Sequence, residues 1–220
     1  MQPDVPSAPL TFDTARNRLW DELVHLHDTW EQYRKLYGHS EDRVKLLNSS
    51  ARSFFALLQR LMVRDVILGI SRLTDPPKSK GKSNLVLSVL LEDPRLTDRP
   101  ELKAELASGI NEAKRLAQPV REHRNRYIAH LDHATAIGAP DDPLPPIPGS
   151  SVDELITRME SVYHRYRGEL DATDSSFELS TLGGFDSLLR VLEDAERWRE
   201  HDTVERRRRY GLDSDENGAA

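Results

Sequence analysis

The stretch VKLLNSSARSFFALLQRLMVRDVILGISRLTDPP, residues 44–77, decides the fold. Apolar side chains recur in it every three or four residues, which is the spacing of one helix face. The stripe expected to pack inward comprises Val44, Leu47, Ala51, Phe54, Leu58, Leu61 and Leu68. Because proline lacks an amide hydrogen and clashes with the preceding turn, Pro76 and Pro77 end the helix. The stretch therefore predicts one long helix that stops at TDPP.

Two charged residues, Asp65 and Arg72, lie on the same stripe. Burial of a charge is costly unless the charge is paired or solvated. We therefore expect the last turns of this helix to face a polar pocket or a polar neighbour.

Further helical stripes lie on both sides of this stretch, over residues 11–37, 98–131, 151–170 and 188–198. Thr11 or Asp13 is suited to cap the first helix, and Pro119 is expected to bend the helix of residues 98–131. A brief helix capped by Ser83 or Asn84 is expected over residues 85–93. No stretch has the alternating pattern of a β-strand. The sequence predicts an all-α bundle with two long antiparallel helices and a third, bent one.

Four segments follow from this pattern. We expect a helical core over residues 1–136, a proline-rich connector over 137–150, C-terminal helices over 151–209 that pack on the same bundle, and a disordered acidic tail over 210–220.

Composition limits the classes of function. The 220-residue chain has no cysteine, which excludes disulfides and thiolate chemistry, and its net charge of -6 argues against broad nucleic-acid binding. No apolar run is long enough to cross a membrane, and the first ten residues lack the pattern of a secretion signal. We expect a cytoplasmic protein without a membrane segment.

The segment VREHRNRYIAHLDH, residues 120–133, carries the candidate chemistry. Arg124 falls on the apolar stripe of its helix, so its charge needs a partner or a cleft. His130 lies six residues on, about 120° further round an ideal helix, and a long arginine side chain can reach the same ligand. Arg126, four residues before His130, shares its face more directly.

These residues resemble a known family. RNRYIAH, residues 124–130, is similar to the arginine, asparagine and histidine signature of the HEPN superfamily of prokaryotic defence proteins. SSARSFFALLQRLMVRDVILGISRLTDPP, residues 49–77, resembles the upstream helix of its abortive-infection AbiU type. The resemblance covers residues 15–135.

The resemblance implies a homodimeric helical bundle that acts as a metal-independent endoribonuclease, with no cofactor. In that reading His130 is the general acid or base, Arg124 binds the phosphate and Asn125 orients the histidine or the ribose. RNA is the implied substrate, and an inhibitor or antitoxin protein is a possible partner. Some relatives are silenced by modification of a tyrosine two residues after the histidine; this chain has Asp132 there, which argues against that route.

Supporting roles are expected for Arg126, Asp132, Arg72 and Asp75. Either aspartate is a candidate anionic partner for Arg124, Arg126 or Arg72.

Alternatives remain open at this level. The cluster of Arg124, Asn125 and His130 is also compatible with a hydrogen-bond network that only stabilises the bundle, or with a non-catalytic module that binds RNA, a nucleotide or a protein. A metal site of His123, His130, Asp132 and His133 has no matching ligand spacing. Two basic groups, Arg206–Arg209 and the lysines Lys78, Lys80 and Lys82, are explained either as solvated charge or as guides for RNA.

Overall fold

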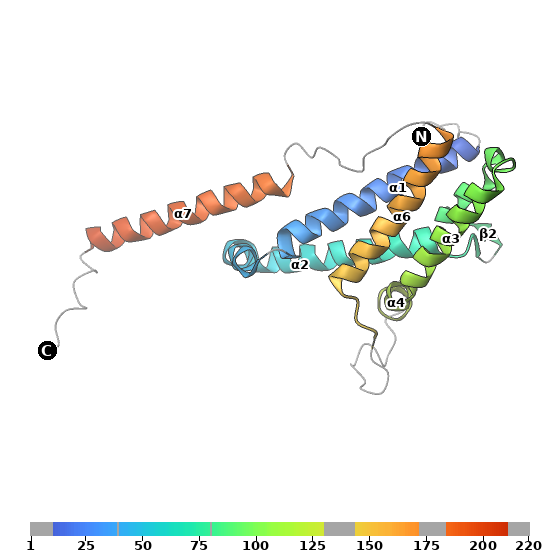
Figure 1. Ribbon diagram of the computed structural model, residues 1–220. Coiled ribbons are helices and arrows are strands. Elements are labelled where there is room, and N and C mark those ends of the chain that lie inside the picture. The colour runs from blue at the N-terminus through green and yellow to red at the C-terminus, as the bar shows by residue number, and fades with distance from the viewer. Residues whose placement is uncertain (1–10, 39, 80, 130–143, 172–183, 211–220) are drawn as a thin grey trace, which may run out of the picture. The chain divides into compact units, whose positions relative to one another are not determined.

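The computed structural model describes residues 11–38, 40–79, 81–129, 144–171 and 184–210, and they are almost entirely helical (Figure 1). The α-helices are α1 (Phe12–Tyr33), α2 (Glu41–Thr74), α3 (Pro100–Leu116), α4 (Gln118–His123), α6 (Gly149–Leu170) and α7 (Phe185–Arg209). Shorter elements are the π-helical turns η1 (Arg34–Gly38) and η4 (Arg124–Ala129), the 3-10 turns η2 (Leu87–Glu92) and η3 (Pro94–Leu96), and the strands β1 (Lys78–Ser79) and β2 (Lys82–Ser83). The predicted all-α class is confirmed.

The chain forms two compact units. The first comprises Met1–Trp30 and Met62–Leu179, and the second comprises Glu31–Leu61 and Ser180–Ala220.

In the first unit, α1 and α2 run antiparallel. His25 Nε2 lies 2.8 Å from Asp65 Oδ2, and about two turns further along α2, Arg72 Nη2 lies 3.4 Å from Glu22 Oε2. The two charges on the α2 stripe therefore face polar groups of α1, as their place on the stripe predicts.

Helix α6 runs antiparallel to both α1 and α3. Toward α1, Trp30 Nε1 donates to Asp153 Oδ1 at 2.7 Å, and His27 Nδ1 lies 2.6 Å from Glu160 Oε1. Toward α3, a Cβ added to Gly109 would lie only 2.7 Å from Val162 Cγ2. The two helices α3 and α6 therefore approach as closely as a glycine permits. The core between these helices includes Leu19, Leu23, Leu26, Val66, Ile70, Leu106, Ile110, Leu155, Met159 and Val162.

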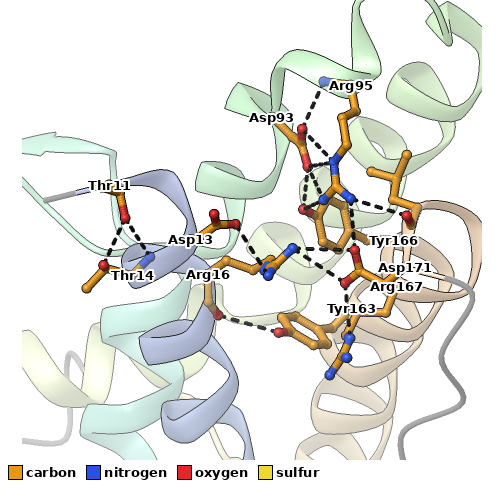
Figure 2. Close-up of polar contacts among 11 residues, drawn as sticks. Thr11, Asp13, Thr14, Arg16, Asp93, Arg95, Tyr163, Tyr166, Arg167 and Asp171 are labelled. Atoms are coloured by element: carbon orange, nitrogen blue, oxygen red, sulfur yellow. Dashed lines mark hydrogen bonds and ion pairs between the residues drawn. The ribbon is translucent and has the colours of Figure 1, made fainter.

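A polar cluster joins α6 to the segment before α3 and to α1 (Figure 2). Asp93, which is buried, accepts a 2.5 Å hydrogen bond from Tyr166 and bonds from Arg95 Nε and Nη2 at 3.0 and 2.7 Å. Arg95 continues to Asp171 at 2.9 Å, and Asp171 pairs with Arg16 at 3.4 Å. We call these five residues the Asp93 cluster. Burial would raise the pKa of Asp93, but the hydrogen bonds from Arg95 and Tyr166 bring it below its ordinary value.

The second unit corrects the predicted stripe of α2. Ala51 has non-helical dihedral angles (φ -160°, ψ 70°), which rotates the residues beyond it relative to one continuous helix. As a result Phe55 is buried, whereas Phe54 and Leu61, predicted to face inward, are 58% and 52% exposed. Within this unit Tyr37 Oη donates to the carbonyl of Phe55 at 2.8 Å.

Helix α7 packs on the other residues of this unit through one of its faces. Leu189 is buried, Asp186 Oδ2 lies 3.3 Å from Lys35 Nζ, and Ser49 Oγ donates to Glu196 at 3.1 Å. The tail expected over residues 210–220 lies, apart from Tyr210, outside the described residues.

Three local predictions need correction. The brief helix expected over residues 85–93 is the shorter 3-10 helix η2, Leu87–Glu92, and Val86, rather than Ser83 or Asn84, is in its capping position. Asn84 instead donates its side-chain amide to the carbonyl of Pro76 at 2.8 Å. The expectation of no strand is wrong, because β1 and β2 pair in a short antiparallel ladder around Gly81, whose φ is 77°.

Two expected helix boundaries are confirmed. Thr11 Oγ1 accepts from the amide of Thr14 at 3.2 Å and so caps α1. The long third helix is interrupted at Ala117, with Pro119 in the first turn of α4. No helix in the described ranges has both the length and the apolar content to cross a membrane.

The close α3–α6 contact predicts the sign of a glycine substitution. In Gly109→Ala the new methyl group collides with Val162, which is buried and stiff at its branched Cβ, so we expect a loss of about 1–2 kcal/mol in the free energy of unfolding. Gly168→Ala on α6 is the matched control: its Cβ would meet nothing within 4 Å, and alanine is the better helix former, so that change should raise stability. Urea unfolding of both variants measures the difference, and equal effects would contradict the contact.

The Asp93 cluster predicts a loss of stability at high pH. Burial and the hydrogen bond to Asp93 raise the pKa of Tyr166 to about 12. The folded state thus keeps this proton where an unfolded tyrosine loses it, near pH 10. The stabilisation is complete below pH 10 and disappears as pH rises through 12.

Unfolding free energies measured from pH 8 to 12 should therefore fall less steeply in Tyr166→Phe than in the unchanged chain. Burial also raises the pKa of Tyr37 and Tyr163. Part of the fall in unfolding free energy with pH should therefore remain in Tyr166→Phe. Parallel curves would show that Tyr166 does not contribute.

Candidate functional site

The candidate site forms where the end of α2 meets α4 and η4. Proline stops α2 after Thr74, and the second break, at Ala117, redirects the chain from α3 into α4. The next residues, Arg124–Ala129, adopt a π-helical turn. Such turns are rare and occur frequently at functional sites. The RNRYIA segment singled out in the sequence is therefore also unusual in its backbone.

An ion pair between Arg124 and Asp75 joins the start of η4 to the residue that follows α2. Arg124 Nη1 and Nη2 donate to the two oxygens of Asp75 at 2.9 and 2.8 Å, in the bidentate geometry that suits a guanidinium and a carboxylate. The side chains are 24% and 19% exposed, so the pair is partly shielded from water. The partner that the position of Arg124 requires is thus Asp75, one of the two aspartates considered from the sequence.

A second arginine supports the same junction. Arg121 Nη1 donates to the carbonyl of Thr74, the last residue of α2, at 3.0 Å, and Arg121 Nη2 donates to Gln118 at 3.1 Å. Arg121 and Arg124 are three residues apart and so share one helix face. The sequence reasoning missed Arg121, although this spacing was available as a signal.

His123 was considered only as a metal ligand, but it has a different contact. Its Nε2 lies 2.6 Å from the carbonyl oxygen of Pro145, in the expected connector. No group of three potential ligands among histidine, aspartate and glutamate gathers in the described ranges. His130, Asp132 and His133 lie outside those ranges. Of the four residues considered as metal ligands, the structure therefore describes only His123.

The remaining predicted residues are not all gathered at one point. Asn125 is exposed on η4. Arg126, on the same turn, is partly buried and pairs with Glu122 at 3.3 Å. Arg72 pairs with Glu22 of α1 at 3.4 Å, rather than with Asp75. His130 and Asp132 lie beyond the described part of the chain.

The geometry leaves Arg124 able to bind an anion. A guanidinium has five N–H donors, and Asp75 takes one from each Nη nitrogen. The second hydrogens of these two nitrogens and the N–H of Nε, which is buried, make no hydrogen bond within the described part of the chain. The positive charges of Arg121 and Arg126 stand within three residues of Arg124. The junction therefore combines a held guanidinium, the exposed amide of Asn125 and the charge of Arg121, which pairs with no carboxylate in the described part of the chain.

A comparison with known protein families covers most of the chain, not the candidate site alone. The family model described as AbiU2, of the HEPN type, matches residues 10–204. No curated protein and no solved structure matches the chain. The match extends past the region of resemblance seen in the sequence and includes α6 and most of α7. The chain belongs to the AbiU2 family of HEPN domains, a family related to abortive infection and defence.

Proposed function

We propose that the protein is a metal-independent endoribonuclease that acts as the toxin or effector of an antiphage, abortive-infection system. The observation that carries the proposal is the bidentate Arg124–Asp75 pair at the start of a π-helical turn, in a chain whose family relates it to defence. The pair fixes a guanidinium in one orientation, while three of its five N–H donors make no hydrogen bond within the described part of the chain.

In this mechanism Arg124 stabilises the phosphate during cleavage. Negative charge develops on the phosphate oxygens in the transition state, and a guanidinium that is already oriented stabilises that charge without reorganisation. Asp75 acts as a positioning residue, because it contacts Arg124 rather than the RNA. Asn125, exposed next to Arg124, would bind the ribose or orient the histidine.

His130 supplies the proton transfers. An imidazole with an ordinary pKa near 6.5 suits removal of the 2'-hydroxyl proton at neutral pH. Strand cleavage also needs a group that protonates the leaving 5'-oxygen. In a homodimer the second copy's histidine can take that role, so one copy acts as base and the other as acid.

The path of the RNA is expected to include the β1–β2 ladder. Lys78 and Lys82 are exposed there, and the ladder begins soon after Asp75 in the sequence. Exposed lysines attract phosphates without selecting a sequence. An inhibitor protein that covers this junction is the expected form of control.

A binding module without catalysis is the second candidate. Asp75 already holds both Nη nitrogens of Arg124, an arrangement that also suits a structural pair or a weak anion site. Cleavage assays separate these functions.

The first test is cleavage of RNA by purified protein in EDTA. We expect the unchanged chain to cut total RNA. His130→Ala should lose about 100-fold or more of the rate, the usual contribution of general acid–base catalysis. Arg124→Ala should also lose about 100-fold or more, because it removes a charge that stabilises the transition state. Arg18→Ala, which removes an exposed arginine of α1 that pairs with Glu22 at 3.3 Å, is the control and should cut normally. Intact RNA with the unchanged chain, or equal cutting by His130→Ala, would exclude the ribonuclease. Binding that Arg124→Ala abolishes, without cutting, would favour the second candidate.

The second test concerns Asp75. Asp75→Ala leaves Arg124 partly buried without its carboxylate, and we expect a loss of about 1–3 kcal/mol in the free energy of unfolding together with a lower kcat. Asp75→Asn keeps the shape of the side chain and one acceptor oxygen. Its stability and kcat should therefore lie between those of the unchanged chain and those of Asp75→Ala.

Glu122→Ala, which breaks the more exposed pair with Arg126, is the matched control, with a change of at most about 1 kcal/mol. A higher kcat in Asp75→Ala would mean that Asp75 blocks the guanidinium rather than positions it.

A further inference from the structure

A cavity of about 870 Å³ is lined by side chains of α3 and α6, which lie side by side in the first unit (Figure 1). We call it the α3–α6 cavity. Gly109 and Val162, the two residues at the close contact of these helices, are both in its lining. Apart from Leu106 and Val162, every side chain in the lining is polar or charged. Because small-molecule sites have volumes of about 300–1,000 Å³, the cavity has the size of a site for a polar ligand.

Arg158 gives the cavity a cation that no carboxylate holds. Its side chain is exposed, and it makes neither a hydrogen bond nor an ion pair in the described part of the chain. Its charge still acts on Glu112, whose pKa is lowered first by the hydrogen bond from Arg115 and also by the charge of Arg158. A guanidinium presents five N–H donors in a planar fork that suits a phosphate. Arg158 is therefore available to bind an anion.

Two further arginines of the lining are held in fixed orientations by glutamates. Arg115 Nε and Nη2 donate to Glu112 at 3.0 and 2.7 Å. Arg165 Nε and Nη2 donate across the cavity to Glu105 at 2.9 and 3.1 Å. Each bidentate pair fixes the plane of its guanidinium. At one end of the cavity Arg115 and Arg158 outweigh Glu112, whereas at the other end Arg165 and Glu105 balance. The cavity therefore has one positive end and one neutral end.

Hydrogen-bonding groups without charge lie between the two ends. Arg158 and Arg165 are seven residues apart on α6, which is about 10 Å along the helix. Ser161 stands between them on α6, and its Oγ donates to the carbonyl of Thr157 at 2.7 Å, so the oxygen can still accept a hydrogen bond. Ser108, exposed on α3, faces the same cavity. Hydroxyl and carboxylate oxygens at this spacing suit the hydroxyl groups of a sugar.

From this arrangement we infer that the α3–α6 cavity binds a small sugar phosphate. The phosphate lies at the positive end, on Arg158 and Arg115. The hydroxyl groups of the sugar extend toward Ser108, Ser161 and Glu105.

The residues of the lining favour this ligand over a nucleic acid. A strand that continued through the cavity would bring its next phosphates toward the carboxylate of Glu105, and like charges repel. None of the residues that line the cavity is aromatic, so it offers no ring on which a base stacks. A ligand with one phosphate and several hydroxyl groups satisfies both ends.

This inference goes beyond the proposed function and does not depend on it. Neither Arg124 nor Asp75 lines the cavity, so substitutions in the cavity leave the candidate site unchanged. Its test measures binding and needs no RNA cleavage.

Titration calorimetry of the full chain with ribose 5-phosphate is the first measurement. We expect saturable binding with a dissociation constant below about 1 mM. Arg158→Ala should raise this constant about tenfold or more, because the charge-assisted hydrogen bonds to the phosphate are lost. Arg158→Lys keeps the charge but not the planar fork, so its constant should lie between the two.

Lys103→Ala is the matched control for the loss of one positive charge. Lys103 is exposed on α3 and does not line the cavity, so this variant should bind ribose 5-phosphate as the unchanged chain does. Circular dichroism checks that each variant is folded.

Inorganic phosphate tests the contribution of the sugar. Ribose 5-phosphate should bind about tenfold more tightly than inorganic phosphate, because its hydroxyl groups add hydrogen bonds to the cavity. Ser108→Ala should reduce this difference and leave the affinity for inorganic phosphate unchanged.

Several outcomes would overturn the inference. These are no saturable binding of ribose 5-phosphate, equal affinity for ribose 5-phosphate and inorganic phosphate, and equal losses in Arg158→Ala and Lys103→Ala. Tighter binding of AMP or of a short RNA, abolished by Arg158→Ala, would assign the cavity to a base or to a nucleic acid instead.

The two proposals can fail separately. A chain that binds ribose 5-phosphate as expected but leaves RNA intact keeps the sugar-phosphate site and loses the ribonuclease. A chain that cuts RNA but binds no ribose 5-phosphate keeps the ribonuclease and loses the sugar-phosphate site.

Discussion

The need to neutralise the Arg124 guanidinium constrains the whole candidate site. A partly buried positive charge is tolerated only with a well-placed partner, and that partner is Asp75, at 2.8 and 2.9 Å. The pair requires α2 to end at Thr74 and α3 to break before Arg124, and prolines sit at both places. Arg121 reinforces the junction by bonding the carbonyl of Thr74. The fold thus serves to hold one arginine in one orientation.

The rest of the first unit keeps that junction in place from a distance. The short contact between Gly109 and Val162 fixes α3 against α6, and α3 leads directly into α4. The Asp93 cluster ties the C-terminal turn of α6 to the residues just before α3. Because α3 is held both through the cluster before its first residue and along its length, its C-terminal end has little freedom to move. Rigid support of this kind is what a preoriented charge needs.

Much of this could be predicted from the sequence, because prolines and helical spacing act locally. The end of α2, the break near Pro119 and the need of Arg124 for a partner all follow from such signals. The stripe of α2 beyond Ala51 could not be predicted: the sequence around Ala51 contains neither proline nor glycine, yet its dihedral angles leave the helical region and turn Phe54 outward. The sequence also could not predict the choice between Asp75 and Asp132, or the pairing of Arg72 with Glu22. Ion pairs between distant segments depend on packing that periodicity does not encode.

The wrong prediction for Phe54 is informative, because it shows that one helix carries both buried and exposed apolar side chains. Had α2 continued without the change at Ala51, Phe54 and Leu61 would lie on the inward stripe that the spacing predicts. The rotation divides the apolar residues into an inner set with Phe55 and Met62, both buried, and an outer set with Phe54 and Leu61. An outer apolar set lowers solubility unless something covers it. The backbone irregularity at Ala51 therefore decides which apolar side chains of this part of α2 are buried and which stay exposed.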